Sequence, residues 1–222
     1  MTMKISDSFL KAQLQNVYWI GGAGYGGKTT ITDLLARRHG FLPYHPENLY
    51  HDHKKAASPE DHPAILAPFH GWEHYFNRPL EEYMAAITDQ SREHFQMVVL
   101  DLIKLSAQAR VVADVFMLDP WDCGRLTEYG KCIFLYADED TIRKGFFDRA
   151  DKQDLLGVIN TLSDPEKTRI HVAEMACALS SSKQAEAQKA GVKVLVRDSK
   201  TPVEETLTAV ENHFNLTSHV DE

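Results

Sequence analysis

One glycine-rich segment near the start of the chain constrains its fold more than any other. Residues 21–30 read Gly-Gly-Ala-Gly-Tyr-Gly-Gly-Lys-Thr-Thr, and from Gly22 to Thr29 they match the pattern G-x-x-x-x-G-K-T. A β-branched and aromatic run precedes the segment at 17–20, and apolar side chains at helical spacing follow it at 31–38. A strand, a glycine-rich loop and a helix in this order indicate a phosphate-binding loop within an α/β fold.

The residue types of this loop suit a chain of phosphate groups. Glycines allow the backbone to curl around the phosphates, and successive amide hydrogens then point inward. The loop opens a helix, whose free N–H groups and positive dipole end face the anion. We expect Lys28 to reach the β- and γ-phosphates and the Thr29 hydroxyl to bind Mg²⁺. The expected nucleotide-binding residues of the loop are Gly22, Ala23, Gly24, Tyr25, Gly26, Gly27, Lys28, Thr29 and Thr30.

Composition limits the partners of this chain. Its 222 residues suit one α/β domain, and no apolar run approaches the roughly 18 residues of a membrane span. The 24 basic and 32 acidic residues give a formal charge of −8, which argues against general nucleic-acid binding. The N-terminus lacks an apolar secretory stretch, and the cysteines show neither metal spacing nor a disulfide framework. We therefore expect a cytoplasmic protein without nucleic-acid or membrane partners.

Predicted strands and helices alternate along the rest of the chain. Pro43 indicates an edge strand, because proline cannot donate to a ladder. The strands predicted after the first cover 41–45, 111–116, 133–136 and 192–196. The predicted helices cover 80–105, 139–184 with a break near 163–165, and 202–214. This alternation predicts a five-stranded parallel sheet with helices on both faces, in a single domain.

Two acids are candidates for organising Mg²⁺ beside the loop. Asp114 lies near the end of the strand at 111–116 and is preferred. Asp101 would end a strand only if residues 97–101 formed one, and we favour a helix there because a better strand follows. One acid with Thr29 suffices, since Mg²⁺ keeps several waters. At the last helix, Thr201 is the expected N-cap, with Pro202 at the first helical position.

The loop at 22–29 and the order of elements resemble the P-loop kinases of the nucleoside, shikimate and adenylate kinase-like group. The resemblance extends over nearly the whole chain, although only the loop is a specific match. It implies a substrate-binding cap after the second strand and an arginine-bearing lid after the fourth. Residues 46–79 occupy the cap position and residues 143–169 the lid position. It also implies ATP and Mg²⁺ as cofactors and a small-molecule phosphate acceptor.

The same resemblance implies an acid just after the second strand that activates the acceptor hydroxyl. Glu47 and Asp52 are the acids near that point, and Asp52 is slightly preferred because His53 follows it. Neither belongs to the Asp-x-Asp or Asp-Asp pair that is usual in the group. Arg143 and Arg149 are the expected lid cations, because they come soon after the fourth strand.

The loop after the last strand, residues 197–202, lies where relatives contact adenine, so Arg197 is an expected nucleotide-binding residue. The chain contains no Asn-Lys-x-Asp motif, which favours ATP over GTP. The cap histidines form no zinc pattern, and Trp72, Tyr75 and Phe76 either wall a pocket or pack the cap. Two alternatives to a kinase are open: a nucleotide-binding regulatory protein, which the missing acidic pair supports, and a plain NTPase. The acceptor and the oligomeric state stay open.

Overall fold

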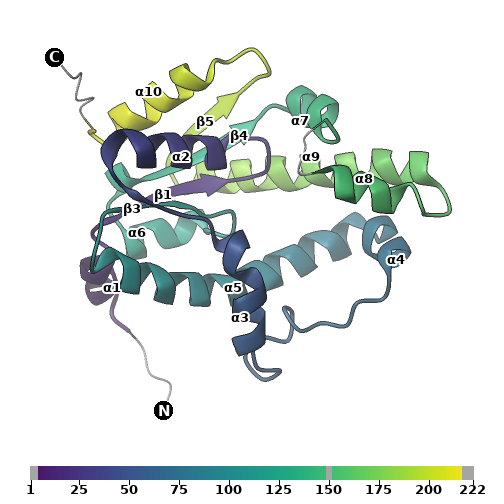
Figure 1. The fold of residues 1–222 in the computed structure, drawn as a ribbon, viewed down its shortest axis with the longest axis horizontal. Helices are drawn as coiled ribbons and strands as arrows, with labels where there is room; N and C mark the ends of the chain where they lie inside the picture. Colours follow the sequence, from purple (N-terminus) through teal and green to yellow (C-terminus); the bar gives the residue numbers. More distant parts are fainter. Residues whose placement is uncertain (1–4, 149–151, 217–222) are drawn as a thin grey trace.

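The structure, a computed structural model that describes residues 5–148 and 152–216, is built on one sheet (Figure 1). Its five strands are all parallel and lie in the order β2-β3-β1-β4-β5. They are β1 (Val17–Gly22), β2 (Leu42–Tyr44), β3 (Val111–Asp114), β4 (Cys132–Ala137) and β5 (Lys193–Arg197). The predicted five-stranded parallel sheet is thus confirmed, and β2 lies at its edge as Pro43 indicated.

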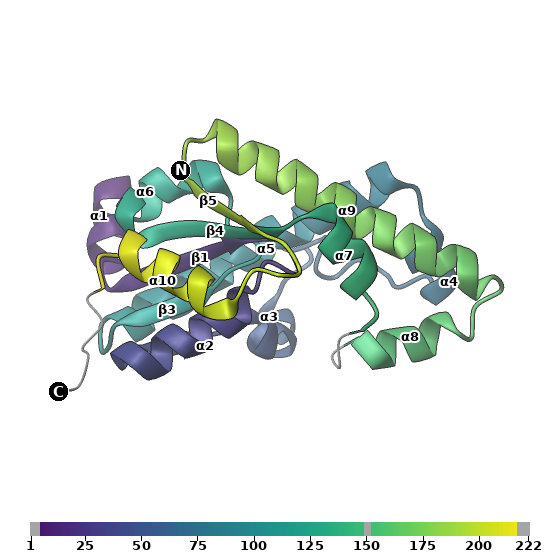
Figure 2. The same ribbon diagram turned by 90° about the horizontal axis from the view of Figure 1, so that it is seen from above.

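Helices cover both faces of this sheet (Figure 2). Two of them, α2 (Lys28–His39) and α10 (Val203–His213), pack on one face. The opposite face is covered by α1 (Asp7–Gln13), α5 (Leu80–Ser106), α6 (Cys123–Leu126) and α9 (Pro165–Lys189). Within the described residues, no helix has the length and apolar character that crossing a bilayer requires. The chain therefore has the three-layer α/β architecture expected from its sequence.

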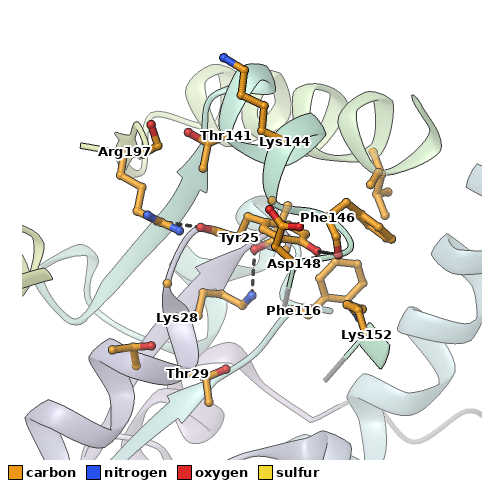
Figure 3. A pocket seen from close by; sticks show the side chains of 18 of the residues that line it. Tyr25, Lys28, Thr29, Phe116, Thr141, Lys144, Phe146, Asp148, Lys152 and Arg197 are labelled. Carbon is orange, nitrogen blue, oxygen red and sulfur yellow. Dashed lines mark hydrogen bonds between the residues drawn. The ribbon is translucent and has the colours of Figure 1, made fainter. Parts of the chain in front are cut away.

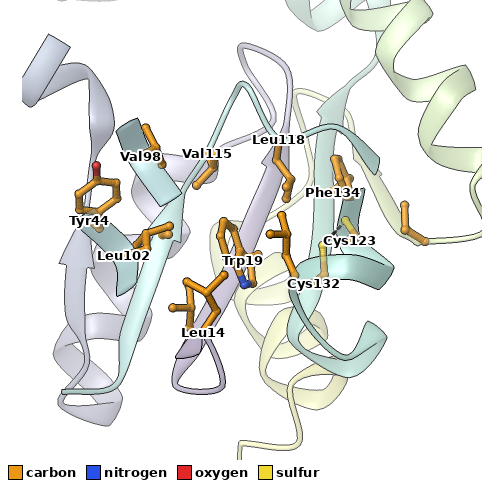
Figure 4. Packing of buried hydrophobic residues seen from close by; sticks show 14 of the residues in the cluster. Leu14, Trp19, Tyr44, Val98, Leu102, Val115, Leu118, Cys123, Cys132 and Phe134 are labelled. Carbon is orange, nitrogen blue, oxygen red and sulfur yellow. Dashed lines mark hydrogen bonds between the residues drawn. The ribbon is translucent and has the colours of Figure 1, made fainter. Parts of the chain in front are cut away.

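Side chains of β1 alternate between the two faces of the sheet. Tyr18 and Ile20 pack on the side of α2 and α10, whereas Val17 and Trp19 pack on the side of α1 and α5 (Figure 4). All six residues of β1 are buried, as in a parallel strand that is covered on both faces. The glycine-rich loop at 22–29 therefore follows a fully buried strand at the centre of the sheet.

Helix α5 runs unbroken through residues 97–101, so the alternative of a strand there is wrong. Asp101 consequently lies on a helix rather than at a strand end. Its carboxylate accepts a hydrogen bond from the Tyr44 hydroxyl at 2.9 Å and contacts the His53 ring at 2.9 Å. Through these contacts Asp101 links α5 to β2 and to the cap.

The last helix begins one residue later than predicted. Pro202 is the cap residue of α10 and Val203 its first residue, so the assignment of Thr201 as N-cap is wrong. The Thr201 hydroxyl donates instead to the Asp198 carboxylate at 2.7 Å. The Asp198 carboxylate also accepts a hydrogen bond from the Lys200 amide at 2.9 Å. Because the Thr201 hydroxyl is bound within this turn, it does not cap α10.

Two segments extend beyond the carboxyl ends of the strands (Figure 1). The cap segment folds as η1 (Pro46–Leu49), α3 (Tyr50–Ala56) and α4 (Trp72–Asn77). After β4 come α7 (Glu139–Gly145) and α8 (Gln153–Ile159), and short turns η2 (Pro120–Asp122) and η3 (Tyr129–Lys131) flank α6. The predicted break near 163–165 is confirmed by the start of α9, but a second break before α8 was not predicted.

A chain of hydrogen bonds joins the cap to α5. His53 of α3 contacts the His94 ring through Nδ1 at 2.8 Å and Asp101 through Nε2 at 2.9 Å. His94 is buried, and Tyr50 packs edge-on against its ring. Desolvation, reinforced by His53, lowers the pKa of His94 to about 4. Among the described residues, no three His, Cys, Asp or Glu side chains are arranged to hold a metal ion.

We expect acid to destabilise the protein through His94. The folded state keeps this ring neutral down to about pH 4, whereas the unfolded chain protonates it near its ordinary pKa of 6.5. Its contribution to stability is therefore complete above pH 6.5 and falls by about 3 kcal/mol as the pH drops to 4. Urea unfolding across this range should show a smaller loss for His94→Gln, and the exposed His74→Gln should match wild type. An unchanged pH dependence in His94→Gln would contradict this expectation.

Candidate functional site

Close contact with β4 and unusual backbone angles shape the glycine-rich loop at 22–29. A Cβ atom on Gly26 would collide with the Leu135 carbonyl, so only glycine fits at that position. Gly27 precedes α2 with a φ of +86°, and Tyr25 has a φ of +69°, which is rare for a bulky residue. The first N–H groups of α2 have no acceptor within the helix, as an anion site requires.

Lys28 and Thr29 begin α2 and reach Asp114 at the end of β3. The Thr29 hydroxyl donates to Asp114 Oδ2 at 2.6 Å. Lys28 Nζ lies 3.7 Å from Asp114 Oδ1 and donates to the Ala23 carbonyl at 2.9 Å. The strand ends meet because β1 and β3 are paired in parallel, with Ile20 opposite Asp114. The structure thus brings Asp114, and not Asp101, to the loop.

The surroundings of Asp114 fit a Mg²⁺ ligand. Its side chain is buried, and Oδ1 has no hydrogen-bond partner among the described residues. Burial acts to raise the pKa of Asp114, but His45, Lys28 and Thr29 together outweigh it and lower the pKa. The ionised Asp114 carboxylate and the Thr29 hydroxyl together suit Mg²⁺, since this ion takes few protein ligands besides water and phosphate.

His45 follows β2 directly and lies at the same cluster. Its Nε2 is 3.0 Å from Asp33 Oδ1, and its Nδ1 is 3.9 Å from Asp114 Oδ2. The carboxylates of Asp114 and then Asp33 raise the pKa of His45, which favours a positive charge beside Asp114. Sequence reasoning placed His45 at the end of the predicted strand 41–45 and gave it no role at the phosphate site. Its position directly after a parallel strand was the signal for a place at this edge.

A cavity of about 1280 Å³ opens beside the loop (Figure 3). It is larger than the roughly 300–1,000 Å³ of a typical pocket for one ligand, which leaves room for a nucleotide and a second molecule. Its walls come from the loop, η1, the lid segment, α5, α9 and the turn after β5. The described residues that line it are Ala23, Gly24, Tyr25, Gly27, Lys28, Thr29, Thr30, Glu47, Tyr83, Phe116, Thr141, Lys144, Gly145, Phe146, Asp148, Lys152, Val172, Ala176, Leu179, Arg197 and Ser199.

The two candidate bases lie in different places. Glu47 of η1 lines the cavity together with Lys28. Asp52 of α3 does not line it; its side chain is 70% exposed and pairs with Lys55 at 2.7 Å. The preference for Asp52 over Glu47 is therefore not supported, because one turn of α3 carries Asp52 away from the phosphate side. The cue that favoured it is also absent, since the His53 ring contacts His94 and Asp101 instead.

The cavity walls change the pKa of the Glu47 carboxyl. Although this side chain is open to the cavity, the surrounding protein displaces part of its hydration and raises its pKa. The Asp114 carboxylate raises the pKa further, while Lys28, His45 and Lys152 act in the opposite direction. Glu47 is thus a carboxylate of increased basicity close to the loop lysine.

The lid cations differ from expectation. Arg143 does not line the cavity, and its guanidinium lies 3.7 Å from Glu139 on the same helix. Arg149 lies outside the described residues. Lys144 and Lys152 do line the cavity, although Figure 3 shows Lys144 extending away from Lys28. Of the described lid cations, Lys152 is therefore better placed than Arg143 to face a transferring phosphoryl group.

Arg197 and Tyr25 connect the loop to its surroundings. Arg197 at the end of β5 donates from Nε to the Tyr25 carbonyl at 2.8 Å and lines the cavity. The Tyr25 hydroxyl donates to the Phe146 carbonyl at 2.7 Å, and the two rings pack at a centroid distance of 5.5 Å (Figure 3). Tyr25 therefore attaches the phosphate-binding loop to the lid segment just after α7, a link that the sequence did not indicate.

Tyr25→Phe should loosen this attachment. Removing the hydroxyl deprives the Phe146 carbonyl of a buried donor, which costs about 1–3 kcal/mol. A thermal melt should show a lower midpoint by about 2–4 °C for each kcal/mol lost. Tyr129→Phe is the matched control, because that ring is 55% exposed. Equal shifts for the two variants would show that the Tyr25 hydroxyl does not stabilise the fold.

Sequence reasoning missed the apolar part of the cavity wall. Phe116 and Tyr83 line it, whereas the aromatic residues Trp72, Tyr75 and Phe76 of α4 do not line it and pack against one another. Phe116 comes two residues after Asp114, and that closeness to a strand end was an available signal. Tyr83 sits within a long amphipathic helix and carried no comparable signal.

Comparison with known proteins identifies a distant structural neighbour and no family. No protein-family model matches the chain, and none of the curated proteins is detectably similar to it in sequence. Among solved structures, shikimate kinase from Acinetobacter baumannii in complex with shikimate superposes with a TM-score of 0.47 at 13% sequence identity. The match covers 92% of this chain and 95% of that chain. Values this low carry no information on the substrate of the present chain.

Proposed function

We propose that this chain is an ATP- and Mg²⁺-dependent kinase that transfers a phosphoryl group to a hydroxyl of a small molecule. The observation that carries the proposal is that Lys28 and Glu47 line one cavity. A loop lysine suits the phosphate donor and a carboxylate suits the acceptor hydroxyl, and the cavity volume allows both ligands to be present together.

On the donor side, the loop amides and Lys28 would hold the phosphates, and Arg197 would lie near the nucleoside. Thr29 and Asp114 would hold Mg²⁺, which neutralises charge on the phosphate oxygens when bound. Their 2.6 Å contact supports this pairing, because one small cation would reach both oxygens. Phosphoryl transfer depends mainly on positioning and charge, and these side chains supply both.

On the acceptor side, Glu47 would orient the hydroxyl and accept its proton. Its raised pKa makes it a stronger base than an ordinary glutamate. Lys152 would offset negative charge on the phosphoryl group during transfer. Of the two expected bases the proposal takes Glu47 rather than Asp52, and it gives Lys152 the role expected for Arg143, because Asp52 and Arg143 do not line the cavity.

Two other functions fit the same donor site, and the lack of the usual acidic pair supports one of them, a nucleotide-binding regulatory protein. In a plain NTPase, Glu47 would orient water rather than an acceptor hydroxyl. In a nucleotide-binding regulatory protein, the loop would bind nucleotide and no transfer would follow.

An acceptor screen separates the three functions. ADP formation is measured with ATP and Mg²⁺ alone and with a panel of neutral alcohols, sugars, nucleosides and hydroxy acids, and products are identified by mass spectrometry. The kinase proposal expects ADP that depends on an acceptor, with an equal amount of phosphorylated product. ADP without any product would indicate an NTPase. Tight nucleotide binding by calorimetry with no ADP would indicate a regulator.

A further inference from the structure

We infer that the acceptor of this kinase is a neutral alcohol with an apolar body; the inference rests on the proposed function. The part of the cavity wall that α5 and α9 contribute carries no charge among its described residues. Helix α9 contributes Val172, Ala176 and Leu179, and α5 contributes Tyr83. The three α9 residues recur at helical spacing, so they form one continuous apolar face.

Phe116 extends this face toward the point of transfer. Its ring centroid is 5.9 Å from Lys28 Nζ, and the ring remains partly exposed in the cavity. The Lys183 amine of α9 lies 4.3 Å from the same centroid and donates to the Phe116 carbonyl at 3.0 Å. Phe116 is thus a fixed apolar platform beside the loop lysine, and Lys183 is committed to holding it.

The charged residues among the described cavity lining come from the loop, η1, the lid segment and the end of β5, and none of them comes from α5 or α9. Lys28 and Arg197 belong to the nucleotide side, and Lys144, Asp148 and Lys152 belong to the lid segment. An anionic acceptor body lying along α9 would lose hydration without gaining a cation from the cavity lining of that helix, because Lys183 does not line the cavity and donates to the Phe116 carbonyl. Each methylene of an apolar body covered by this wall should instead strengthen binding about fourfold.

A matched pair of ligands tests the inference by binding alone. The two ligands are 3-phenylpropane-1,2-diol, called phenylpropanediol below, and 3-phenyllactate, called phenyllactate. They share an aromatic body and a hydroxyl, and they differ only in that the first carries a hydroxymethyl group where the second carries a carboxylate. Xylitol offers hydroxyls without an apolar body. Calorimetry on the full chain, loaded with Mg²⁺ and a non-hydrolysable ATP analogue, should show phenylpropanediol binding at least about tenfold more tightly than either other compound.

Two alanines of α9 provide matched variants. Ala176→Asp places a carboxylate on the apolar wall and should weaken phenylpropanediol binding about tenfold, whereas Ala178→Asp, which does not line the cavity, should leave it unchanged. Absence of phenylpropanediol binding to wild type, or equal or tighter binding of phenyllactate or xylitol, overturns the inference. So does equal weakening by both variants. These readouts need no phosphoryl transfer, so they are separate from the acceptor-dependent ADP that tests the kinase itself.

Discussion

Replacing Lys28 with methionine is expected to lower ATP turnover at least about 100-fold. Lys28 is the only side-chain cation of the phosphate-binding loop, and its amine lies 3.7 Å from the proposed Mg²⁺ ligand Asp114. Charge that develops on the phosphoryl oxygens would then lose its nearest fixed positive partner, and removal of one such group typically costs about 10²–10³ in rate. Turnover at saturating ATP, with the acceptor found by screening, measures the loss.

The fold should survive this substitution, because methionine keeps the length of the buried stem. Asp114 would still accept the Thr29 hydroxyl and lie beside His45. Circular dichroism and the melting midpoint check that the variant is folded. Lys54→Met, on the exposed side of α3, is the control and should retain turnover. A folded Lys28→Met protein whose turnover stays within about threefold of wild type would remove Lys28 from the mechanism.

The features that sequence predicted are those set by local pattern. The period of the apolar residues placed all five strands and the long helix α5, and the glycine pattern located the loop. The preference for Asp114 over Asp101 also followed from local pattern, since Asp114 ends strand β3 whereas Asp101 lies within helix α5. Parallel pairing then brings that strand end to the loop without further information.

The features that sequence did not predict depend on how segments pack far from each other along the chain. Glu47 and Asp52 differ by one turn of backbone, and only the path of η1 and α3 shows which faces the cavity. The attachment of Tyr25 to Phe146 spans more than a hundred residues of sequence. Neither arrangement has a periodic signal, so composition and spacing could not reveal it.

Replacing Glu47 with glutamine is expected to lower phosphoryl transfer to the acceptor by about 10²–10⁴-fold, because a neutral amide cannot take the proton of the hydroxyl. Glutamine keeps the shape of the side chain, so the cavity and the nucleotide site should be unchanged. Asp52→Asn is the matched control, since Asp52 is exposed, pairs with Lys55 at the surface and does not line the cavity. Its transfer rate should stay within about twofold of wild type. The opposite ranking of the two variants would restore Asp52 as the base.

The pH dependence of transfer should identify Glu47 independently of the size of the loss. A base must be ionised to act, so transfer falls as the pH drops through its pKa. Desolvation by the cavity walls and the nearby Asp114 carboxylate raise the pKa of Glu47, so this fall should begin at a higher pH than for an ordinary glutamate. Glu47→Gln should lack this acidic limb while retaining any limb due to His45, whereas Asp52→Asn should keep it. Because a merely structural glutamate would lower the rate without removing a limb, the profile separates a proton acceptor from a packing role.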